Sequence, residues 1–473
     1  MKTPTVPYKG TDKLIVGIVF GVITFWLFAQ SMVNIVPDVQ ADLGISLDTL
    51  NIAISLTALF SGIFIVVAGG LADKFGRVKL TYIGLILSII GSLLLILAHG
   101  SGMLIAGRVI QGLSAACIMP ATLALMKTYF EGAERQRALS FWSIGSWGGS
   151  GVCSFAGGAI ATYMGWRWIF VFSIVFAVLA MLLIKGTPES KSQVEPSDSK
   201  ARFDFGGLVA FVITLVTLNL IITRGSSFGW TSAITLSLAA VFLVSMFIFF
   251  KIELRHANGF IDFTLFKNKA YTGATVSNFL LNAAAGTLVV ANTYVQIGRG
   301  FTAFESGLLS LGYLVCVLVM IRVGEKLLQK HGSRKPMITG SLITAIGIAL
   351  MSFTFVPGFL YTLLVFVGFM LFGIGLGMYA TPSTDTAVSN APESKVGIAS
   401  GIYKMASSLG GSFGVAISAS VYGVIAAAGS IELAAMIGLL TNVAFCVVSL
   451  LSVIITAPKG SKKENAALAP AAK

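Results

Sequence analysis

Fourteen long apolar segments constrain this chain more than any other feature of its sequence. Each has about 18 or more residues, the length that an α-helix needs to cross a hydrocarbon layer of about 30 Å. Helices are expected because every backbone amide inside lipid must be hydrogen-bonded within its own segment. The fold class is therefore predicted to be all-α, a polytopic membrane protein with 14 transmembrane helices. The segments lie at 13–36, 49–71, 80–98, 103–126, 138–163, 168–185, 205–223, 231–250, 271–296, 304–324, 336–355, 359–382, 397–425 and 433–456.

The composition supports this prediction and excludes other classes of protein. Hydrophobic residues make up 56% of the 473 residues and charged residues 11%, against roughly 45–50% and roughly 25% in soluble domains. The net charge of +13 comes from short loops rather than one basic face, so we expect no nucleic-acid partner. The 3 histidines and 4 cysteines form no ligand motif, so no metal and no other cofactor is expected. The sequence lacks a GxxxxGK[ST] loop, which argues against ATP as the energy source.

The basic residues predict the orientation of the chain in the membrane. Of the 32 Lys and Arg residues, 26 lie in loops on the side of the two termini. Only Arg167, Arg224 and Arg299 lie in loops on the other side. Because loops rich in Lys and Arg stay in the cytoplasm, both termini are predicted to be cytoplasmic.

The order of the segments predicts four parts. Residues 1–190 form an N-terminal bundle of six helices, and residues 271–458 form a second bundle of six. Residues 191–270 hold cytoplasmic linkers and two inserted transmembrane helices. Residues 459–473 (KGSKKENAALAPAAK) are predicted to be a disordered basic tail.

The two connections next to the inserted helices differ in composition. Gly186–Arg202 is polar and rich in Ser and Pro, so we expect a solvated linker. Lys251–Ala270 mixes charges with three phenylalanines and is expected to lie along the membrane surface.

Two motifs place charge close to or inside the apolar segments. After the second segment the chain reads GGLADKFGRVK, in which Asp73 and Arg77 are predicted to form a cytoplasmic latch. Gly69 and Gly76 permit close packing and a tight turn there. In the fourth segment Arg108 and Gln111 share one helical face with Gly112 and Ala115. A guanidinium inside a membrane is costly unless it is paired or hydrated, so Arg108 is predicted to be functional, with structural hydrogen bonding as the alternative. For Gln111 a helix-to-helix hydrogen bond is an equal alternative.

The fifth segment carries a row of small residues. Gly145, Gly149, Cys153 and Gly157 follow one another at intervals of four, and Gly158 comes directly after them. Such a row lets a second helix approach closely and slide.

The two charged motifs resemble those of the major facilitator superfamily. Its first cytoplasmic loop has the pattern Gly-x-Leu-Ala-Asp-Arg-x-Gly-Arg-Lys, and its drug/proton antiporters carry Arg-x-x-Gln-Gly where this chain has Arg108, Gln111 and Gly112. A weaker copy of the loop at Gly324–Lys335, which lacks the aspartate, favours two related halves. The fourteen segments point to the fourteen-helix drug/proton antiporter family, and segments 1, 5 and 13 look like NorB-type quinolone exporters.

This resemblance implies a transporter rather than an enzyme, in the cell membrane of a bacterium. It implies two six-helix bundles with an inserted helix pair, acting as a monomer by alternating access. Amphipathic drugs such as quinolones and lipophilic cations would leave in exchange for protons. Two alternatives stay open: a major facilitator transporter for a specific metabolite, and a membrane sensor or structural protein that transports nothing.

The sequence departs from the family pattern in two places. Cys153-Ser154 replaces the Gly-Pro pair of the antiporter motif in the fifth segment, which removes a proline kink. No acidic residue lies at the middle of any segment, so proton coupling is expected from acids at the segment mouths. Asp38 is the first candidate, followed by Asp42 and Asp385, with a solvated loop acid as the alternative for each. Pro382 before Asp385 lacks an amide donor and would allow local unwinding.

The expected substrate cavity combines polar side chains of the first and ninth segments with aromatic and Met side chains. Aromatic and Met side chains suit binding of varied apolar ligands. Hydrogen bonding between helices is the alternative for the polar residues, and ordinary packing is the alternative for the apolar ones. The predicted set is Trp26, Gln30, Asn34, Met119, Trp142, Asn278, Asn282, Gln296 and Tyr379.

Overall fold

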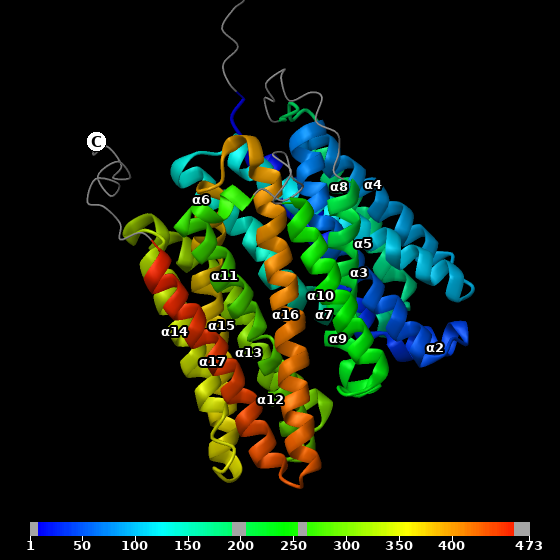
Figure 1. Ribbon diagram of the computed structural model, residues 1–473, viewed down its shortest axis with the longest axis vertical. Helices are drawn as coiled ribbons and strands as arrows, with labels where there is room; N and C mark the ends of the chain where they lie inside the picture. The colour runs from blue at the N-terminus through cyan, green and yellow to red at the C-terminus, as the bar shows by residue number, and fades with distance from the viewer. Residues whose placement is uncertain (1–7, 192–204, 254–262, 458–473) are drawn as a thin grey trace, which may run out of the picture. The chain divides into compact units, whose positions relative to one another are not determined.

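The computed structural model describes residues 8–191, 205–253 and 263–457, and every regular element in these ranges is a helix (Figure 1). The first half contains α1 (Asp12–Asn34), α2 (Val36–Leu43), α3 (Leu47–Phe75), α4 (Arg77–Ile96), α5 (Ser101–Tyr129), α6 (Gly132–Ser143), η1 (Ile144–Gly148), α7 (Gly149–Met164) and α8 (Arg167–Ile184). The remainder contains α9 (Phe205–Phe228), α10 (Ala233–Glu253), η3 (Phe263–Lys267), α11 (Lys269–Ala283), α12 (Gly286–Ile297), α13 (Ala303–His331), α14 (Arg334–Met351), α15 (Gly358–Ser389), η4 (Glu393–Lys395), α16 (Val396–Ala427) and α17 (Ile431–Thr456).

Each predicted segment coincides with one helix or with consecutive helices of this list. Among the described residues, ten helices are long and apolar enough to cross a membrane. The helical, membrane-spanning character of the chain is thus confirmed, whereas the number fourteen stays a prediction.

Contacts within the chain define two compact units. Unit 1 comprises Met1–Ser197 and Ala391–Ile402, and unit 2 comprises Asp198–Asn390 and Tyr403–Lys473. Helix α16 therefore begins in unit 1 and continues in unit 2. The predicted tail at 459–473 and most of the predicted linker Gly186–Arg202 lie outside the described residues.

The inserted helices α9 and α10 pack on each other within unit 2. The Thr214 hydroxyl donates to the Ser245 hydroxyl at 2.9 Å, and the rings of Phe211 and Phe249 lie 5.3 Å apart between centroids. Two small hydroxyls can lie face to face here because each helix presents few other polar groups at this depth.

Helix α5 is the most buried helix of unit 1. In its most apolar 18-residue window 78% of the residues are buried. Glycines explain how neighbours come so close: a Cβ added to Gly91 of α4 would lie 2.8 Å from Gln111 Cγ, and one added to Gly112 would lie 2.7 Å from the carbonyl oxygen of Thr57 in α3. The charged motif of α5 is consequently surrounded by other helices.

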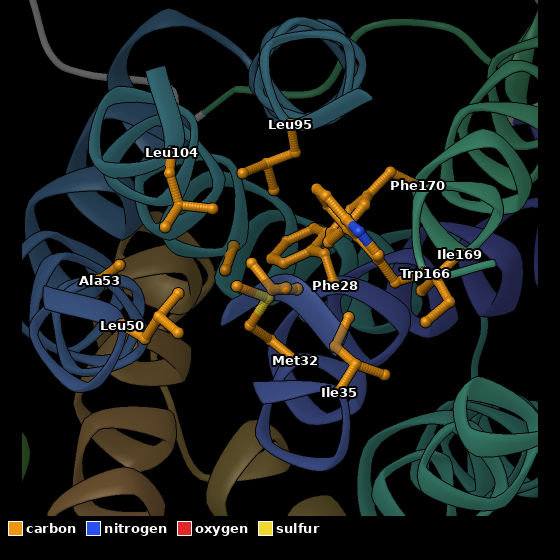
Figure 2. Close-up of a cluster of buried hydrophobic side chains, with 12 residues drawn as sticks. Phe28, Met32, Ile35, Leu50, Ala53, Leu95, Leu104, Trp166, Ile169 and Phe170 are labelled. Atoms are coloured by element: carbon orange, nitrogen blue, oxygen red, sulfur yellow. The ribbon is translucent and has the colours of Figure 1, made fainter. Parts of the chain in front are cut away.

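A cluster of twelve buried apolar side chains fills one part of unit 1 (Figure 2). Figure 2 shows Phe28 near its middle, facing Met32 of the same helix and the ring of Trp166. The members are Phe28, Met32, Ile35, Val39, Leu50, Ala53, Leu95, Leu104, Ala115, Trp166, Ile169 and Phe170. We call them the apolar cluster.

Two predicted segments are interrupted in ways that the sequence analysis missed. Segment 138–163 contains a π-helix, η1, between α6 and α7. Segment 271–296 breaks between α11 and α12, where a Cβ on Gly414 of α16 would overlap the Ala283 carbonyl group. The close approach of α16 at this point accompanies the break in the helix.

The expected unwinding at Pro382 is wrong. Helix α15 continues through this proline to Ser389. The hydroxyls of Thr384 and Thr386 donate to the carbonyl oxygens of Ala380 and Pro382, at 2.9 and 2.7 Å. The proline removes the helical donor to the carbonyl oxygen of Met378, four residues earlier, yet the helix continues on both sides of it.

Candidate functional site

Arg108 lies in the interior of unit 1 with 1% of its surface exposed. Its Nη1 donates to the carbonyl oxygen of Phe28 at 2.6 Å and to Gln111 Oε1 at 3.0 Å. Its Nε donates to the carbonyl oxygen of Ala53 at 3.4 Å. All of these acceptors are neutral, so the described contacts solvate the cation without cancelling its charge.

Gln111 extends this site towards two other helices. Its Nε2 donates to the Ser92 hydroxyl of α4 at 3.4 Å, and Ser92 in turn donates to the Ser173 hydroxyl of α8 at 3.4 Å. The predicted common face of Arg108 and Gln111 is therefore present, and it forms the hydrogen bonds between helices that were the alternative for Gln111.

The apolar cluster borders the cation directly. Phe28 and Ala53 supply carbonyl oxygens to Arg108, while their side chains belong to the cluster. Leu104 and Ala115, one and two turns from Arg108 on the same helix, belong to it as well. Apolar side chains keep water from competing for these hydrogen bonds, which strengthens them.

The predicted latch is assembled around the Asp73 carboxylate, which is 4% exposed. Asp73 Oδ1 accepts from Arg77 Nη2 at 2.8 Å and from the Gly397 amide at 3.0 Å. Asp73 Oδ2 accepts from the Ile398 amide at 3.1 Å. The carboxylate therefore caps the N-terminus of α16, where amides lack partners within the helix and the dipole favours a negative charge.

Arg77 holds the segment that precedes α16. Its Nη2 donates to the carbonyl oxygen of Glu393 at 2.9 Å, and its Nη1 donates to the Thr128 hydroxyl at 2.5 Å. Lys127 Nζ donates to the carbonyl oxygen of Ala391 nearby. We refer to Asp73, Arg77, Lys127 and their contacts with residues 391–398 as the latch.

The glycines of the loop motif make the latch possible. A Cβ on Gly69 would overlap the carbonyl oxygen of Gly397, so α3 and α16 touch through their backbones. Gly76 has a φ of +123°, a backbone conformation that residues other than glycine rarely adopt. Steric constraints therefore explain why glycine occupies both positions, 69 and 76, of the predicted latch motif.

The row of small residues in the fifth segment faces α1. A Cβ on Gly145 would lie 3.2 Å from Val22 Cγ1, and one on Gly149 would lie 2.5 Å from Trp26 Cδ1. The Ser31 hydroxyl donates to the Cys153 carbonyl oxygen at 2.9 Å, and Gly157 packs on the same serine. Gly158 has no neighbour within 4 Å of its would-be Cβ and is not part of the row.

The three predicted coupling acids lie in different environments. Asp38 is exposed on the short helix α2. Asp42 is also exposed and pairs with Arg167, whose guanidinium stacks on the Trp166 ring at 4.4 Å from its centroid. Asp385 is 6% exposed and accepts from the Ser389 hydroxyl at 3.1 Å.

The predicted cavity residues that the structure describes differ in their burial. Met119 and Trp142 are buried, and Trp142 Nε1 donates to the Thr122 hydroxyl at 3.1 Å. Trp26 is half-buried. Gln296 lines a shallow hollow of about 350 Å³ along α12. The side chains of Gln30 and Asn34 lie outside the described part of the structure.

Asn278 and Tyr379 belong to a buried hydrogen-bond network in unit 2. Asn278 Nδ2 donates to the Tyr403 carbonyl oxygen at 3.0 Å and to the Ser407 hydroxyl at 2.6 Å. Half-buried Asn282 donates to Asn278 Oδ1 at 2.9 Å. The Tyr379 hydroxyl accepts from Ser383 at 3.0 Å and is hydrogen-bonded to the Ser277 hydroxyl at 2.5 Å, with either oxygen able to donate. The bonds of Asn278 to α16 and of Tyr379 to Ser277 are hydrogen bonds between helices, the alternative named for the polar residues, whereas the bond of Asn282 lies within α11.

Two charged side chains that lie within or beside apolar segments of the sequence are buried in unit 2. Glu325 is buried in α13, where it pairs with Arg322 and accepts from Gln329 Nε2 at 3.2 Å. Lys404 is buried in α16. A charge within or beside an apolar segment was the available signal for both.

The chain is similar to known proteins in sequence and in fold. The family profile described as Major Facilitator Superfamily matches residues 18–415 and 274–473. The quinolone resistance protein NorB of Staphylococcus aureus strain MRSA252 is 57% identical over 452 residues, which cover 96% of this chain and 97% of that protein. The protein of the same name from strain JH9 has the same identity and coverage.

Two solved structures share the fold. The human organic anion transporter MFSD10 (TETRAN) aligns with a TM-score of 0.64 at 12% identity, covering 93% of this chain and 98% of that one. The proton:xylose symporter XylE, bound to 6-bromo-6-deoxy-D-glucose, aligns with a TM-score of 0.65 at 15% identity, covering 97% and 98%. At these identities the likeness concerns the fold alone.

Proposed function

The chain belongs to the major facilitator superfamily, and from this premise we propose that it is a proton-driven drug exporter working by alternating access. The observation that carries the proposal is the 57% identity to quinolone resistance proteins over 96% of the chain. We propose quinolones and lipophilic cations as substrates. Fourteen spans, cytoplasmic termini and a monomeric state are part of the same proposal.

The Arg108 site supports a role in handling charge. A guanidinium held by neutral acceptors keeps its attraction for anions, and the low dielectric of its surroundings strengthens that attraction. We propose that Arg108 and Gln111 respond to the protonation state of the transport pathway. A carboxylate that loses its proton becomes a partner for such a cation.

We propose Asp385 as the acid that couples export to protons, in place of Asp38. A coupling acid must be shielded from water in at least one state, so that its proton is released only when access changes sides. Asp385 is 6% exposed, whereas Asp38 and Asp42 are both exposed. Burial therefore favours Asp385.

We propose that the latch opens and forms again during transport. Hydrogen bonds to charged groups contribute about 1.5–3 kcal/mol each, and Asp73 makes two of them to the amides of α16. The membrane potential supplies about 2.3 kcal/mol per charge per 100 mV, besides any pH gradient. The two quantities are of similar size, so proton entry can drive the release and re-formation of the latch.

Transport into vesicles with an imposed pH gradient tests the proposal. Purified protein should move a fluoroquinolone or a lipophilic cationic dye against its gradient, and a protonophore should abolish this movement. Vesicles that carry the Arg108→Ala variant serve as the control. Failure to move any member of a broad drug panel contradicts drug export, and movement that ignores the protonophore contradicts proton coupling.

The specific-metabolite alternative predicts a different outcome of the same assay. A metabolite transporter would show saturable, pH-dependent flux with one compound class and none with the drugs. A sensor or structural protein would move nothing, although it would still insert into the vesicles.

A further inference from the structure

The chain that leaves α8 lies across the N-terminus of α4. Glu189 Oε1 accepts from the Val78 amide at 2.9 Å, and Glu189 Oε2 accepts from the Lys79 amide at 2.8 Å. The Arg77 amide donates to the carbonyl oxygen of Ser190 at 2.9 Å. Three successive amides in the first turn of α4 are thus bonded by residues more than 100 positions later in the chain.

Helix α4 needs this external cap because it has none of its own. Its N-cap residue is Gly76, which has no side chain to accept from the first-turn amides. A Cβ on Gly76 would lie 2.7 Å from each Glu189 oxygen, closer than real contacts allow. Gly76 therefore leaves room for the Glu189 carboxylate, whose negative charge also suits the helix dipole.

A second contact holds the same segment on α5. The Tyr129 hydroxyl donates to the carbonyl oxygen of Pro188 at 2.5 Å, and the Tyr129 ring packs edge-on against Tyr8 at 5.0 Å. Residues 188–190 are therefore fixed at the ends of α4 and α5. This corrects the expectation that the connection beginning at Gly186 is solvated throughout.

The capped turn includes the arginine of the latch. The backbone of Arg77 bonds to Ser190, while its side chain bonds to Asp73, Thr128 and the Glu393 carbonyl oxygen. The direction of the Arg77 side chain depends on the position of its backbone. The Glu189 cap and the latch thus meet at one residue.

We propose that Glu189 is a positioning residue for the latch and acts through Arg77. Its carboxylate holds the first turn of α4 in the place where Arg77 reaches the segment before α16. The transport part of the test rests on the proposed function, whereas the exchange part does not.

Amide hydrogen exchange on the purified full-length protein tests the contact directly. In Glu189→Ala the amides of residues 78 and 79 should exchange roughly tenfold or more faster, because each loses a hydrogen bond to a charged group. The amides of Gly397 and Ile398, which bond to Asp73, should also exchange faster. Glu189→Gln keeps the shape of the side chain and loses its charge, so its exchange rates should lie between those of the wild type and of Glu189→Ala.

Glu134→Ala is the matched control. Glu134 is an exposed acid in the first turn of α6, and its loss removes the same charge without touching α4. It should leave both pairs of amides as they are in the wild type. Faster exchange at 78 and 79 with unchanged exchange at 397 and 398 overturns the proposal, since Glu189 would then anchor the linker alone. Unchanged exchange at all four amides overturns it as well.

Transport kinetics give a second readout. Glu189→Ala should lower the maximal export rate severalfold while leaving the KM for the drug unchanged, since the latch governs cycling rather than binding. Combined with Arg77→Ala, it should slow export no further than Arg77→Ala alone, because both changes act at one contact. Additive losses contradict action through Arg77. A wild-type protein that exports no drug contradicts the proposed function, while the exchange result still decides the role of Glu189.

Discussion

Arg108 combines full burial with a set of neutral acceptors, which is an uncommon environment for a cation. Two of its acceptors are backbone carbonyl oxygens, of Phe28 and Ala53. A charge inside an apolar segment was enough to select Arg108 from the sequence. Its acceptors could not be predicted, because every residue has a carbonyl group and the choice depends on how α1 and α3 pack on α5.

Replacing Arg108 separates charge from geometry. Arg108→Ala should reduce proton-driven drug export at least tenfold, with normal amounts of protein in the membrane. Arg108→Lys should retain part of the activity, because an ammonium keeps the charge but not the planar fork that reaches Phe28 and Gln111 together. Export and expression are measured side by side, with Arg137→Ala as control, an exposed arginine that pairs with Asp12. Wild-type export by Arg108→Ala would remove Arg108 from the site.

The adjacent residues Gly69 and Gly70 allow a matched pair of Gly→Ala variants to be compared. Gly69→Ala places its methyl group on the Gly397 carbonyl oxygen, so α3 and α16 must move apart and the latch should weaken. Gly70→Ala meets Ile398 at an ordinary 3.5 Å and should be tolerated. Severalfold slower export is expected for the first and wild-type export for the second. Equal behaviour of the two variants argues against backbone contact at this point.

At the scale of elements, apolar segments were predictable and their interruptions were not. Hydropathy summed over about 19 residues averages out local detail, so each predicted segment coincides with one helix or with consecutive helices. The π-helix Ile144–Gly148 and the break after Ala283 lie where α1 and α16 come close, and the hydropathy of a single segment does not encode such contacts. In the fifth segment this π-helix, rather than a proline, provides the irregularity near the small-residue row.

The row on α7 allows a prediction about this element. Gly149→Ala should collide with the ring of Trp26 and separate α7 from α1. An added methyl in a packed interface costs about 1–3 kcal/mol, so the melting temperature in detergent should fall and export should slow. Gly158→Ala, whose methyl would meet nothing within 4 Å, should match the wild type in both measurements. A stable, active Gly149→Ala variant would show that the row tolerates a wider spacing.

For the whole molecule, the position of α16 is the most consequential feature. It begins in unit 1, held by Asp73, and continues in unit 2 with Tyr403 and Ser407 in a buried network. The predicted division into bundles at 1–190 and 271–458 assigns all of α16 to the second bundle, and that division stays a prediction.

Coupling of drug export to protons is a property of the whole molecule, and we expect substitution of Asp385 to remove it. Asp385→Asn should abolish export driven by a pH gradient while preserving drug exchange at equal pH on both sides. The amide cannot take up and release a proton but keeps the size of the side chain. Asp38→Asn, at an exposed position, should export normally. Gradient-driven export by Asp385→Asn would return the coupling role to Asp38 or Asp42. Normal export by all three Asn variants would leave Asp73, Glu305, Glu325 or the drug itself.

The latch grips residues 391–398 through main-chain atoms: the carbonyl oxygens of Ala391 and Glu393 and the amides of Gly397 and Ile398. The printed contacts of Glu393 with the latch use its carbonyl oxygen rather than its side chain. In a saturation-mutagenesis library selected for drug resistance, positions 393 and 394 should therefore accept most residue types. Position 397 should accept none but glycine, and Asp73 and Arg77 should be equally intolerant. Substitutions at positions 393 and 394 should thus leave drug resistance intact. A compound designed to bind the latch in place of residues 391–398 must mimic a peptide backbone rather than a side chain.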